Sequence, residues 1–488
     1  MINRITPNSF TSSMKSRRAE QSREGSGHNY FISDTVDMGQ ASIAGLNRLT
    51  SDDLTPEGKI PIIISNKKKG GLNKLKGEIA RKFNVNDATL KEDLFLVDAM
   101  KVEVKPGNLR ELMKYLPQDT EVVVDNKIKF PIPAELKKYP RDTANRPTLD
   151  MANSTLRMNL LWDKGFTGKG VGICVIDSGI HPHKDFDDRI KAFVDMNENK
   201  ASPHDSYGHG THVAGIAAGS GASSAGKYKG VAPDADIVGV RITSVSEAIK
   251  GIQWAIENKD KYNIKVLNVS LGDFPIKSYK EDPWAQAAEK AWDKGLVVCV
   301  AAGNEGPGEG TVSTPGISPK VITVGAMDDK NTAKREDDTM SLFSSRGPTT
   351  PDGIEKPDVV APGVEIFSTL SPNSTLDDPD LPHVEDKYIA ISGSSMATPM
   401  VSGLSALLLQ ANPDLTPDEI KDILTNTAEK YLPNVTHNDQ GAGLIDPVES
   451  LQVALGKKTP HKPDHPEEVP MIIADGLEKK SQNQIEKS

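Results

Sequence analysis

The chain beyond residue 147 alternates short apolar runs with helical patterns, and this alternation constrains its fold more than any other feature. The apolar runs occupy residues 171–176, 237–240, 266–269, 296–300 and 321–324. The helical patterns occupy residues 210–218, 246–258, 284–294 and 396–410. Strands that are apolar on both faces and separated by helices form a parallel sheet with helices on both sides. We therefore expect an α/β domain whose ligands bind at the carboxyl ends of the strands.

A smaller pattern precedes this domain. Its elements are expected in the order β-α-β-β-α-β, at residues 60–64, 72–83, 94–104 (one bent strand or a pair), 109–116 and 121–130. That order is typical of a small, two-layer α+β domain of the ferredoxin-like kind.

Composition sets the expected boundaries of the domains. Residues 1–58 are polar and rich in Ser without a sustained period, so we expect a disordered leader. The small domain is assigned to residues 59–140 and the α/β domain to residues 146–455, and the stretch 131–147, rich in Pro and charge, is expected to link them. Residues 456–488 carry several Pro, Lys and Glu residues and are expected to form a disordered tail.

Charge and apolar content narrow the range of partners. The formal net charge of −10 argues against binding to nucleic acid or to an anionic membrane, since both need clustered Lys and Arg. No apolar run approaches the ~18 residues of a membrane span, and residues 1–30 lack the apolar core of a secretory signal. Cys174 and Cys299 lie inside apolar runs, where a cysteine usually behaves as a small buried hydrophobe, and no disulfide is predicted.

Three polar residues lie at strand ends or helix starts, where ligands of such a sheet are expected. Asp177 follows the first apolar run, where a carboxylate is either a structural cap or part of a site. His209 stands at the start of a helical pattern and is a candidate base, or else a satisfied surface or core residue. Asn304 follows the run at 296–300; its amide can donate to an oxyanion, as acyl transfer requires, and a plain turn residue is the alternative.

A fourth polar residue, Ser395, lies in the segment Ser392-Gly393-Ser394-Ser395-Met396, where a helix is expected to begin. A hydroxyl is a weak nucleophile that needs an adjacent base, and a helix N-terminus adds unpaired N–H groups for an anionic intermediate. Gly393 is expected to supply a turn, and Pro399 to fall in the first turn of the helix. Taken alone, a Ser in this position is more often an N-cap.

Two groups of histidines leave a metal site open as an alternative. His209 and His212 have a suitable spacing but lack the Glu of the zinc-protease motif. His181 and His183 lie near three carboxylates, those of Asp185, Asp187 and Asp188. For this second group a solvated loop is the favoured interpretation, and we expect no metal in the chemistry.

The chain resembles the subtilisin-like serine peptidases, or subtilases, over about residues 156–455. The resemblance rests on segments around the four polar residues: Val175-Ile176-Asp177-Ser178-Gly179, His209-Gly210-Thr211-His212-Val213-Ala214-Gly215, residues 301–306 and Gly393-Ser394-Ser395-Met396-Ala397-Thr398-Pro399. The chain order Asp, His, Ser is that of subtilisin and differs from the chymotrypsin and α/β-hydrolase orders. The resemblance implies that Ser395 is the nucleophile and that His209 is the general base and then the general acid. It also implies that Asp177 orients His209 and that Asn304 donates to the oxyanion.

The same resemblance implies residues that bind the substrate. One set matches the extended segment that pairs with the substrate backbone: Ser270, Leu271 and Gly272. Another matches a wall of the first specificity pocket: Ala301, Ala302 and Gly303. That pocket is expected to prefer a large apolar or aromatic side chain, and Glu305 near its mouth to admit Lys or Arg. The small domain at 59–140 resembles the propeptide of the family, which assists folding and then inhibits.

Two segments depart from the family pattern. After Val238-Gly239-Val240-Arg241 the chain passes almost directly into the helical pattern at 246, so the Gly-rich segment that usually forms the other rim of the cleft has no clear counterpart. This leaves binding beyond the first pocket open. Residues 219–227 lack the Asn and Asp oxygens of the family's tight calcium loop. We therefore expect any structural calcium to be weak or to bind elsewhere.

These observations predict a serine endopeptidase that is made as a self-processing proenzyme, acts on polypeptides and is inhibited by its own propeptide. A transpeptidase or macrocyclase that transfers the acyl group from Ser395 to an amine is one alternative, and a peptide-binding pseudoenzyme is another. Processing is expected between Tyr139 and Arg146. A cytoplasmic zymogen is the expected location, with export by a non-classical route as the alternative.

Overall fold

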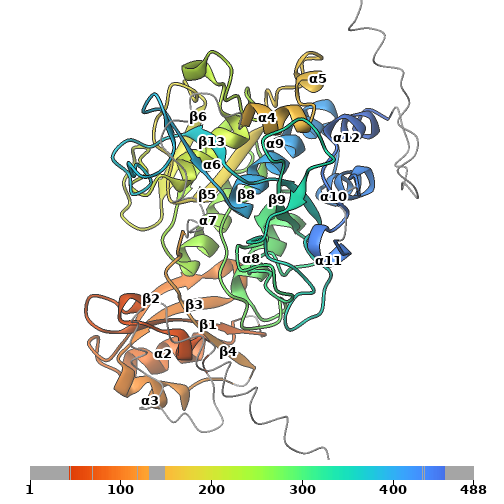
Figure 1. The fold of residues 1–488 in the computed structure, drawn as a ribbon. Coiled ribbons are helices and arrows are strands. Elements are labelled where there is room, and N and C mark those ends of the chain that lie inside the picture. Colours follow the sequence, from red (N-terminus) through yellow and green to blue (C-terminus); the bar gives the residue numbers. More distant parts are fainter. Residues whose placement is uncertain are drawn as a thin grey trace, which may run out of the picture.

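The structure is a computed structural model that describes residues 43–130 and 149–456, apart from 44, 69, 118, 431, 433 and 434. The described chain forms two units, each with its own sheet and apolar core (Figure 1). The predicted linker, the predicted tail after its first residue and most of the predicted leader lie outside the described residues.

The small unit has the predicted β-α-β-β-α-β order. Its elements are β1 (Ile60–Asn66), α2 (Asn73–Lys82), β2 (Ala88–Leu94), β3 (Ala99–Val104), α3 (Leu109–Met113) and β4 (Thr120–Val124). The strands form an antiparallel sheet in the order β2-β3-β1-β4. The strand β2 begins earlier than expected, because its sequence is mostly polar and gives no apolar run, and the short helix η3 (Phe95–Val97) separates it from β3.

The prediction of a disordered leader was wrong for the last residues of that segment, because they belong to the small unit. Two short helices, η1 (Leu46–Arg48) and η2 (Ser51–Asp53), precede β1. Ile43 and Leu49 are buried in the core of the small unit. Single apolar residues scattered among polar ones show no period, so the sequence did not distinguish this segment from the polar stretch before it.

The large unit is built on a mainly parallel sheet, as predicted. Its strands are β5 (Gly172–Asp177), β6 (Ile190–Asp195), β7 (Asp236–Arg241), β8 (Ile264–Val269), β9 (Val297–Ala301), β10 (Ile322–Asp328), β11 (Thr339–Met340) and β12 (Val359–Pro362). The order is β11-β10-β9-β8-β5-β7-β6, with β12 also paired to β10. Only the pair of β10 with β11 is antiparallel among those described.

Helices cover both faces of this sheet. On one face α6 (His209–Ala218) packs against α9 (Ser394–Ala411), and on the other α7 (Val245–Asn258) packs against α8 (Pro283–Asp293) (Figure 1). The small unit contacts the face formed by α7 and α8, where Leu94 and Val97 join the core of the large unit. The α/β fold with helices on both faces is therefore confirmed.

Further elements complete the large unit without a clear signal in the sequence. They are α4 (Leu149–Thr155), α5 (Asn159–Trp162), α10 (Pro417–Thr427), α11 (His437–Gln440), α12 (Pro447–Ala454) and the small antiparallel sheet of β13 (Ile366–Thr369), β14 (His383–Val384) and β15 (Tyr388–Ile391). Most of these elements are short, and the sequence analysis did not identify α10 although Thr416 and Glu419 form a capping box at its start.

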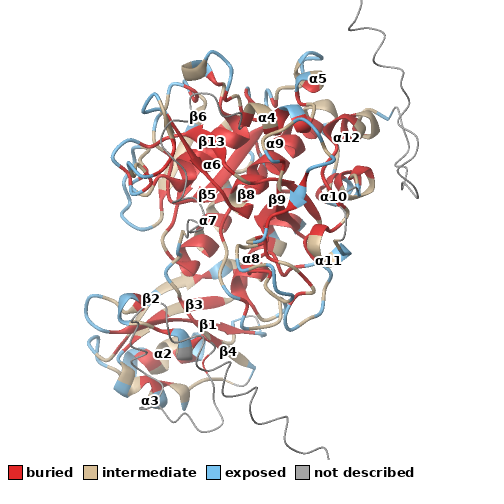
Figure 2. Ribbon diagram, viewed as in Figure 1, coloured by how far each residue is buried: buried red, intermediate tan, exposed pale blue. Residues whose placement is uncertain are grey.

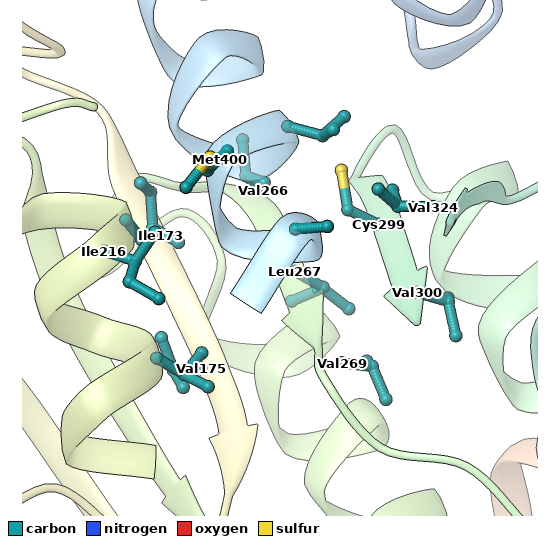
Figure 3. Packing of buried hydrophobic residues seen from close by; sticks show 14 of the residues in the cluster. Ile173, Val175, Ile216, Val266, Leu267, Val269, Cys299, Val300, Val324 and Met400 are labelled. Carbon is teal, nitrogen blue, oxygen red and sulfur yellow. The ribbon is translucent and has the colours of Figure 1, made fainter. Parts of the chain in front are cut away.

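The core of the large unit lies between the sheet and its helices, and Figure 2 shows the buried residues concentrated there. In Figure 3, Met400 of α9 lies beside Val266 of β8, and Cys299 of β9 lies beside Val324 of β10. Both cysteines are free and buried, and burial raises the pKa of the Cys299 thiol to about 12. They act as small apolar side chains, as the sequence predicted.

Candidate active site

The structure brings Asp177 and His209 together at the carboxyl edge of the sheet. Asp177 ends β5 and His209 begins α6, and Nδ1 of His209 lies 2.8 Å from Oδ1 of Asp177. Both side chains are buried, which strengthens their electrostatic interaction. Because a carboxylate only accepts, the hydrogen-bond pattern assigns the imidazole proton to Nδ1 and leaves Nε2 as the basic nitrogen.

A glycine permits this close approach of helix and strand. A Cβ atom at Gly210 would lie 2.1 Å from the carbonyl oxygen of Gly179 and 3.0 Å from Cβ of Asp177. No other residue fits between them, so the sequence His209-Gly210 is required for α6 to reach the end of β5.

Ser395 lies in the first turn of α9, which begins at Ser394 as the sequence predicted. Its hydroxyl donates to the carbonyl oxygen of Ser270 at 2.8 Å, so in this state it is not directed at His209. The expectation for Pro399 was wrong: it lies inside α9, beyond the first turn, and its missing N–H leaves the Ser395 carbonyl without a helical partner.

The side chain of Asn304 is held by Ser394. Its Oδ1 accepts from the Ser394 N–H at 2.9 Å and from the Ser394 hydroxyl at 3.0 Å. This pair of bonds assigns Nδ2 to the opposite side, where a Cβ atom at Gly393 would lie 3.3 Å from it. Gly393 has an extended backbone that any residue adopts, so its role is to leave room beside Asn304 and not to make the expected turn.

The sequence did not single out Asp205, which fixes the start of α6. Its Oδ1 accepts from the Ser178 hydroxyl at 2.9 Å and from the Gly208 N–H at 2.8 Å. Its Oδ2 accepts from the N–H and hydroxyl of Thr211 at 2.9 and 2.7 Å. Asp205 is buried, and this burial raises its pKa. Asp205 therefore links the residue after Asp177 to the residue before His209. In the sequence, only its position four residues before a His at a helix start could have indicated this role.

Two of the predicted substrate-binding residues contact the start of α9: the Ser270 carbonyl accepts from the Ser395 hydroxyl, and Gly303 contacts Ser394. Ser270 and Leu271 are buried, and at Gly272 a Cβ atom would lie 2.6 Å from Cβ of Ser313. Ala301 and Ala302 are buried as well, while Gly303 donates its N–H to the Ser394 hydroxyl at 3.1 Å. Glu305 is exposed and its N–H donates to the Ser345 hydroxyl at 3.0 Å.

The end of the small unit lies along the opposite rim. The Ile128 N–H donates to the Thr243 carbonyl at 2.8 Å, and the Val245 N–H donates to the Asn126 carbonyl at 3.2 Å. These bonds form an antiparallel bridge between Lys127 and Ser244. The short segment before α7 therefore offers backbone groups to an extended chain although it lacks the Gly-rich pattern of the family.

The aromatic ring of Phe130 ends the described part of this segment next to His209. The two ring centroids lie 5.4 Å apart. The Tyr207 hydroxyl donates to the Phe130 carbonyl oxygen. The predicted processing region between Tyr139 and Arg146 lies outside the described residues.

The histidine groups do not form metal sites. Nε2 of His212 lies 3.0 Å from the carbonyl oxygens of both Ile366 and Ile389, and burial lowers the pKa of His212 to about 3, so it is a neutral core residue. The expectation of a solvated loop was wrong for the His183 side chain, because its ring packs against Phe186 and Tyr388. Within the described ranges there is no group of three or more His, Cys, Asp or Glu residues suited to a metal ion.

The segment that corresponds to the family's calcium loop does not fit a calcium ion. Asp185, the buried carboxylate beside it, accepts from the Ser223 N–H and from the Tyr388 hydroxyl, both at 2.8 Å. Both carboxylate oxygens are thus used by protein donors, and residues 219–227 contribute no acidic side chain.

No helix in the described part of the chain is both long and apolar enough to cross a bilayer.

Comparison with known proteins identifies the family of this chain. Residues 168–443 match the subtilase family. The chain is 41% identical over 387 residues to serine protease AprX of Bacillus subtilis (strain 168), covering 77% of this chain and 83% of that protein. It is 36% identical over 366 residues to subtilisin E of the same organism, covering 71% and 83%.

Among solved structures, fervidolysin from Fervidobacterium pennivorans, a keratinolytic enzyme related to subtilisin, aligns with a TM-score of 0.59. The identity is 23%, and the alignment covers 81% of this chain and 61% of the fervidolysin chain, so this likeness supports the fold alone. The family match over more than half of the chain and the identity to AprX show that this protein belongs to the subtilase family and is a serine endopeptidase that acts on polypeptides.

Proposed function

We propose that Ser395 is the nucleophile of this peptidase and that His209 activates it. The observation that carries the proposal is the 2.8 Å bond between Nδ1 of His209 and Oδ1 of Asp177, at the sheet edge where α9 presents Ser395. This bond holds the imidazole with Nε2 free to act as a base.

The reaction proceeds in two acyl-transfer steps. Nε2 of His209 takes the hydroxyl proton as Oγ of Ser395 bonds to the substrate carbonyl carbon, and it then gives that proton to the leaving amine. Water repeats the sequence on the acyl-enzyme and releases the acid. Asp177 stabilises the imidazolium that forms in each step. Because the hydroxyl donates to Ser270 in the described state, substrate binding has to redirect it toward His209.

Asn304 is proposed to stabilise the negative oxygen that develops in each step. Its Oδ1 is occupied by two donors from Ser394, so its Nδ2 is the group left to donate to an oxyanion. The fixed orientation means that little reorganisation is needed when the charge develops. The strip from Ser270 to Gly272 is proposed to pair with the substrate backbone, and residues 301–303 to wall the first pocket, with Glu305 admitting basic side chains at its mouth.

We further propose that the small unit is an inhibitory propeptide. Residues 126–130 pair with the backbone of the segment before α7, and the Phe130 ring lies 5.4 Å, centroid to centroid, from the imidazole of His209. The Phe130 carbonyl accepts a hydrogen bond from the Tyr207 hydroxyl, which holds the end of this segment beside α6. Self-processing after residue 130, in the region predicted at 139–146, would leave the unit bound as a product.

A buried carboxylate of the small unit, that of Asp125, supports tight binding to the large unit. Within the small unit, Nζ of Lys101 lies 2.8 Å from Oδ2 of Asp125, whose side chain is fully buried. Asp125 also accepts from the N–H and the hydroxyl of Ser246 at 2.8 and 2.7 Å, in the first turn of α7. Covering the site in this way would protect other proteins in the compartment of synthesis, and we keep a cytoplasmic zymogen as the proposed location, to be tested by fractionation of producing cells.

The full chain with Ser395→Ala tests the proposal. We expect it to fold, to stay uncleaved in isolation and to react with no fluorophosphonate, whereas the unmodified chain matures and is labelled at Ser395. Maturation of the pure Ser395→Ala chain without added protease would reject Ser395 as the nucleophile. Release of peptide amides in place of acids when amines are added would identify a transpeptidase.

A further inference from the structure

Residues 126–130 meet the cleft with alternate side chains. Asn126, Ile128 and Phe130 are partly buried against the large unit, while Lys127 and Lys129 are exposed. Ile128 and Phe130 pack against the apolar core of the large unit. This period of two is that of a strand with one face on a surface, so each inward side chain occupies a separate subsite.

The subsite of Asn126 contains a carboxylate. Nδ2 of Asn126 donates to Oδ2 of Asp273 at 2.6 Å. Asp273 directly follows the strip from Ser270 to Gly272 and lies on the rim opposite Thr243 and Val245, so the segment 126–128 runs between the two rims.

The carboxylate of Asp273 is held in place independently of the small unit. Its backbone exchanges two hydrogen bonds with Thr314, at 3.0 and 2.9 Å. Its Oδ1 accepts from the Phe274 N–H at 2.7 Å. Removal of the small unit therefore leaves Oδ2 without the Asn126 donor but leaves the side chain oriented toward the cleft.

We propose that Asp273 is a specificity-determining residue that selects polypeptides with a donating side chain, amide or cationic, at the position of Asn126. The selected sequence has an aliphatic residue two positions later and an aromatic residue four positions later, in the places of Ile128 and Phe130. This inference rests on the proposed function, in which residues 126–130 occupy the substrate cleft. An acidic side chain at the first position is rejected, because it would bring two carboxylates together at the cleft edge.

The test uses enzyme matured from the full chain and peptide substrates that differ at one position. All carry Ile and Phe in the places of Ile128 and Phe130, and they carry Asn, Lys, Asp or Glu in the place of Asn126. We expect kcat/KM to be about tenfold or more higher for Asn than for its isostere Asp, and for Lys than for Glu, the range for a hydrogen bond to a charged group. Equal rates for Asn and Asp on the unmodified enzyme would overturn the proposal.

The variant Asp273→Asn assigns the preference to this residue. It keeps an oxygen for the Phe274 N–H and removes the charge, so we expect the ratio of Asn to Asp peptides to fall to near one while the enzyme stays active. Asp260→Asn is the matched control, because the Asp260 side chain is 94% exposed on a loop, and it should keep the ratio of the unmodified enzyme.

An unchanged ratio in Asp273→Asn would reject Asp273 as the cause. Failure of the proposed function gives a different result, namely no hydrolysis of any peptide and no fluorophosphonate labelling of Ser395.

Discussion

The ring of Phe130 lies against the imidazole of His209, with 5.4 Å between their centroids. The same ring packs on Tyr207 at 4.7 Å. A side chain from the small unit thus occupies the space beside the proposed general base. Because a substrate has to bring its reacting atoms within hydrogen-bonding distance of that base, the proposed inhibition predicts that this contact blocks catalysis while it persists.

Phe130→Ala in the full chain should weaken this block. The aromatic contact contributes about 1 kcal/mol beyond its buried area, so the inhibited complex should dissociate about fivefold more readily, or more. The measurement is the lag before activity appears after maturation begins, which should shorten. Lys129→Ala is the control, since Lys129 is exposed on the same segment. Equal lags for the two variants would show that Phe130 does not stabilise the binding of the small unit over the site.

Asn304→Ala should lower kcat by about 10²–10³ with little change in KM, the range known for loss of the oxyanion asparagine in subtilisin itself. Ser394→Ala should have a smaller effect of the same kind, because it removes one of the two donors that orient the Asn304 amide. Steady-state kinetics on a peptide substrate measure both. A change confined to KM in Asn304→Ala would make Asn304 a turn residue.

The fold, and the positions in it of the four candidate residues, were predictable because each has a local signal. The buried strands appear in the sequence as apolar runs, and Asp177, His209, Asn304 and Ser395 follow such runs or begin helices. Parallel topology then places strand ends and helix starts on one edge, which is why residues far apart in sequence could be expected to meet.

Contacts that depend on two distant segments were not predictable. Asp205 accepts from Ser178, and Asp273 accepts from Asn126, and no local pattern predicts either of these long-range contacts. The sequence left open whether the segment before α7 can bind an extended chain, because it lacks glycines. The C=O of Thr243 and the N–H of Val245 nevertheless pair with residues 126–128, since backbone pairing does not depend on the side chains.

Asp205→Asn should lower kcat about tenfold or more while KM stays within a factor of two. The amide loses one acceptor, so its NH2 faces the Thr211 or the Gly208 donors, and a buried unpaired donor costs about 1–3 kcal/mol. The displaced start of α6 carries His209 with it. Kinetics and thermal unfolding, measured together, separate the effect on the site from the loss of stability.

Asp446→Asn supplies the control for a buried carboxylate at a helix start. Asp446 caps α12 by accepting from the Val448 and Glu449 N–H groups at 3.0 and 3.1 Å, remote from His209 in sequence and fold. It should lower the melting temperature without changing kcat. If Asp205→Asn behaves in the same way, Asp205 stabilises the fold and has no part in positioning His209.

Asp329→Asn should stabilise the protein above pH 7. Burial, together with the carboxylates of Asp338 and Asp328, raises the pKa of Asp329 to about 7 from an ordinary 3.8. A carboxyl group whose pKa is raised on folding stabilises the fold fully below its unfolded pKa, and this contribution is lost as the pH rises through the folded value. The stabilising contribution of Asp329 is therefore lost between about pH 4 and pH 7. Above pH 7 the fold contains an ionised, buried carboxylate.

The asparagine keeps the shape and the acceptor for the Asn331 N–H, which lies 3.0 Å from Oδ1 of Asp329, but has no charge to bury. In a Ser395→Ala background, which prevents self-digestion, we expect Asp329→Asn to raise the melting temperature at pH 8 by about 2 °C or more and to raise it less, or lower it, at pH 5. Asp260→Asn should change neither value. A melting-temperature difference that is the same at both pH values would mean that Asp329 does not titrate in this range, and the stabilisation would then have another origin.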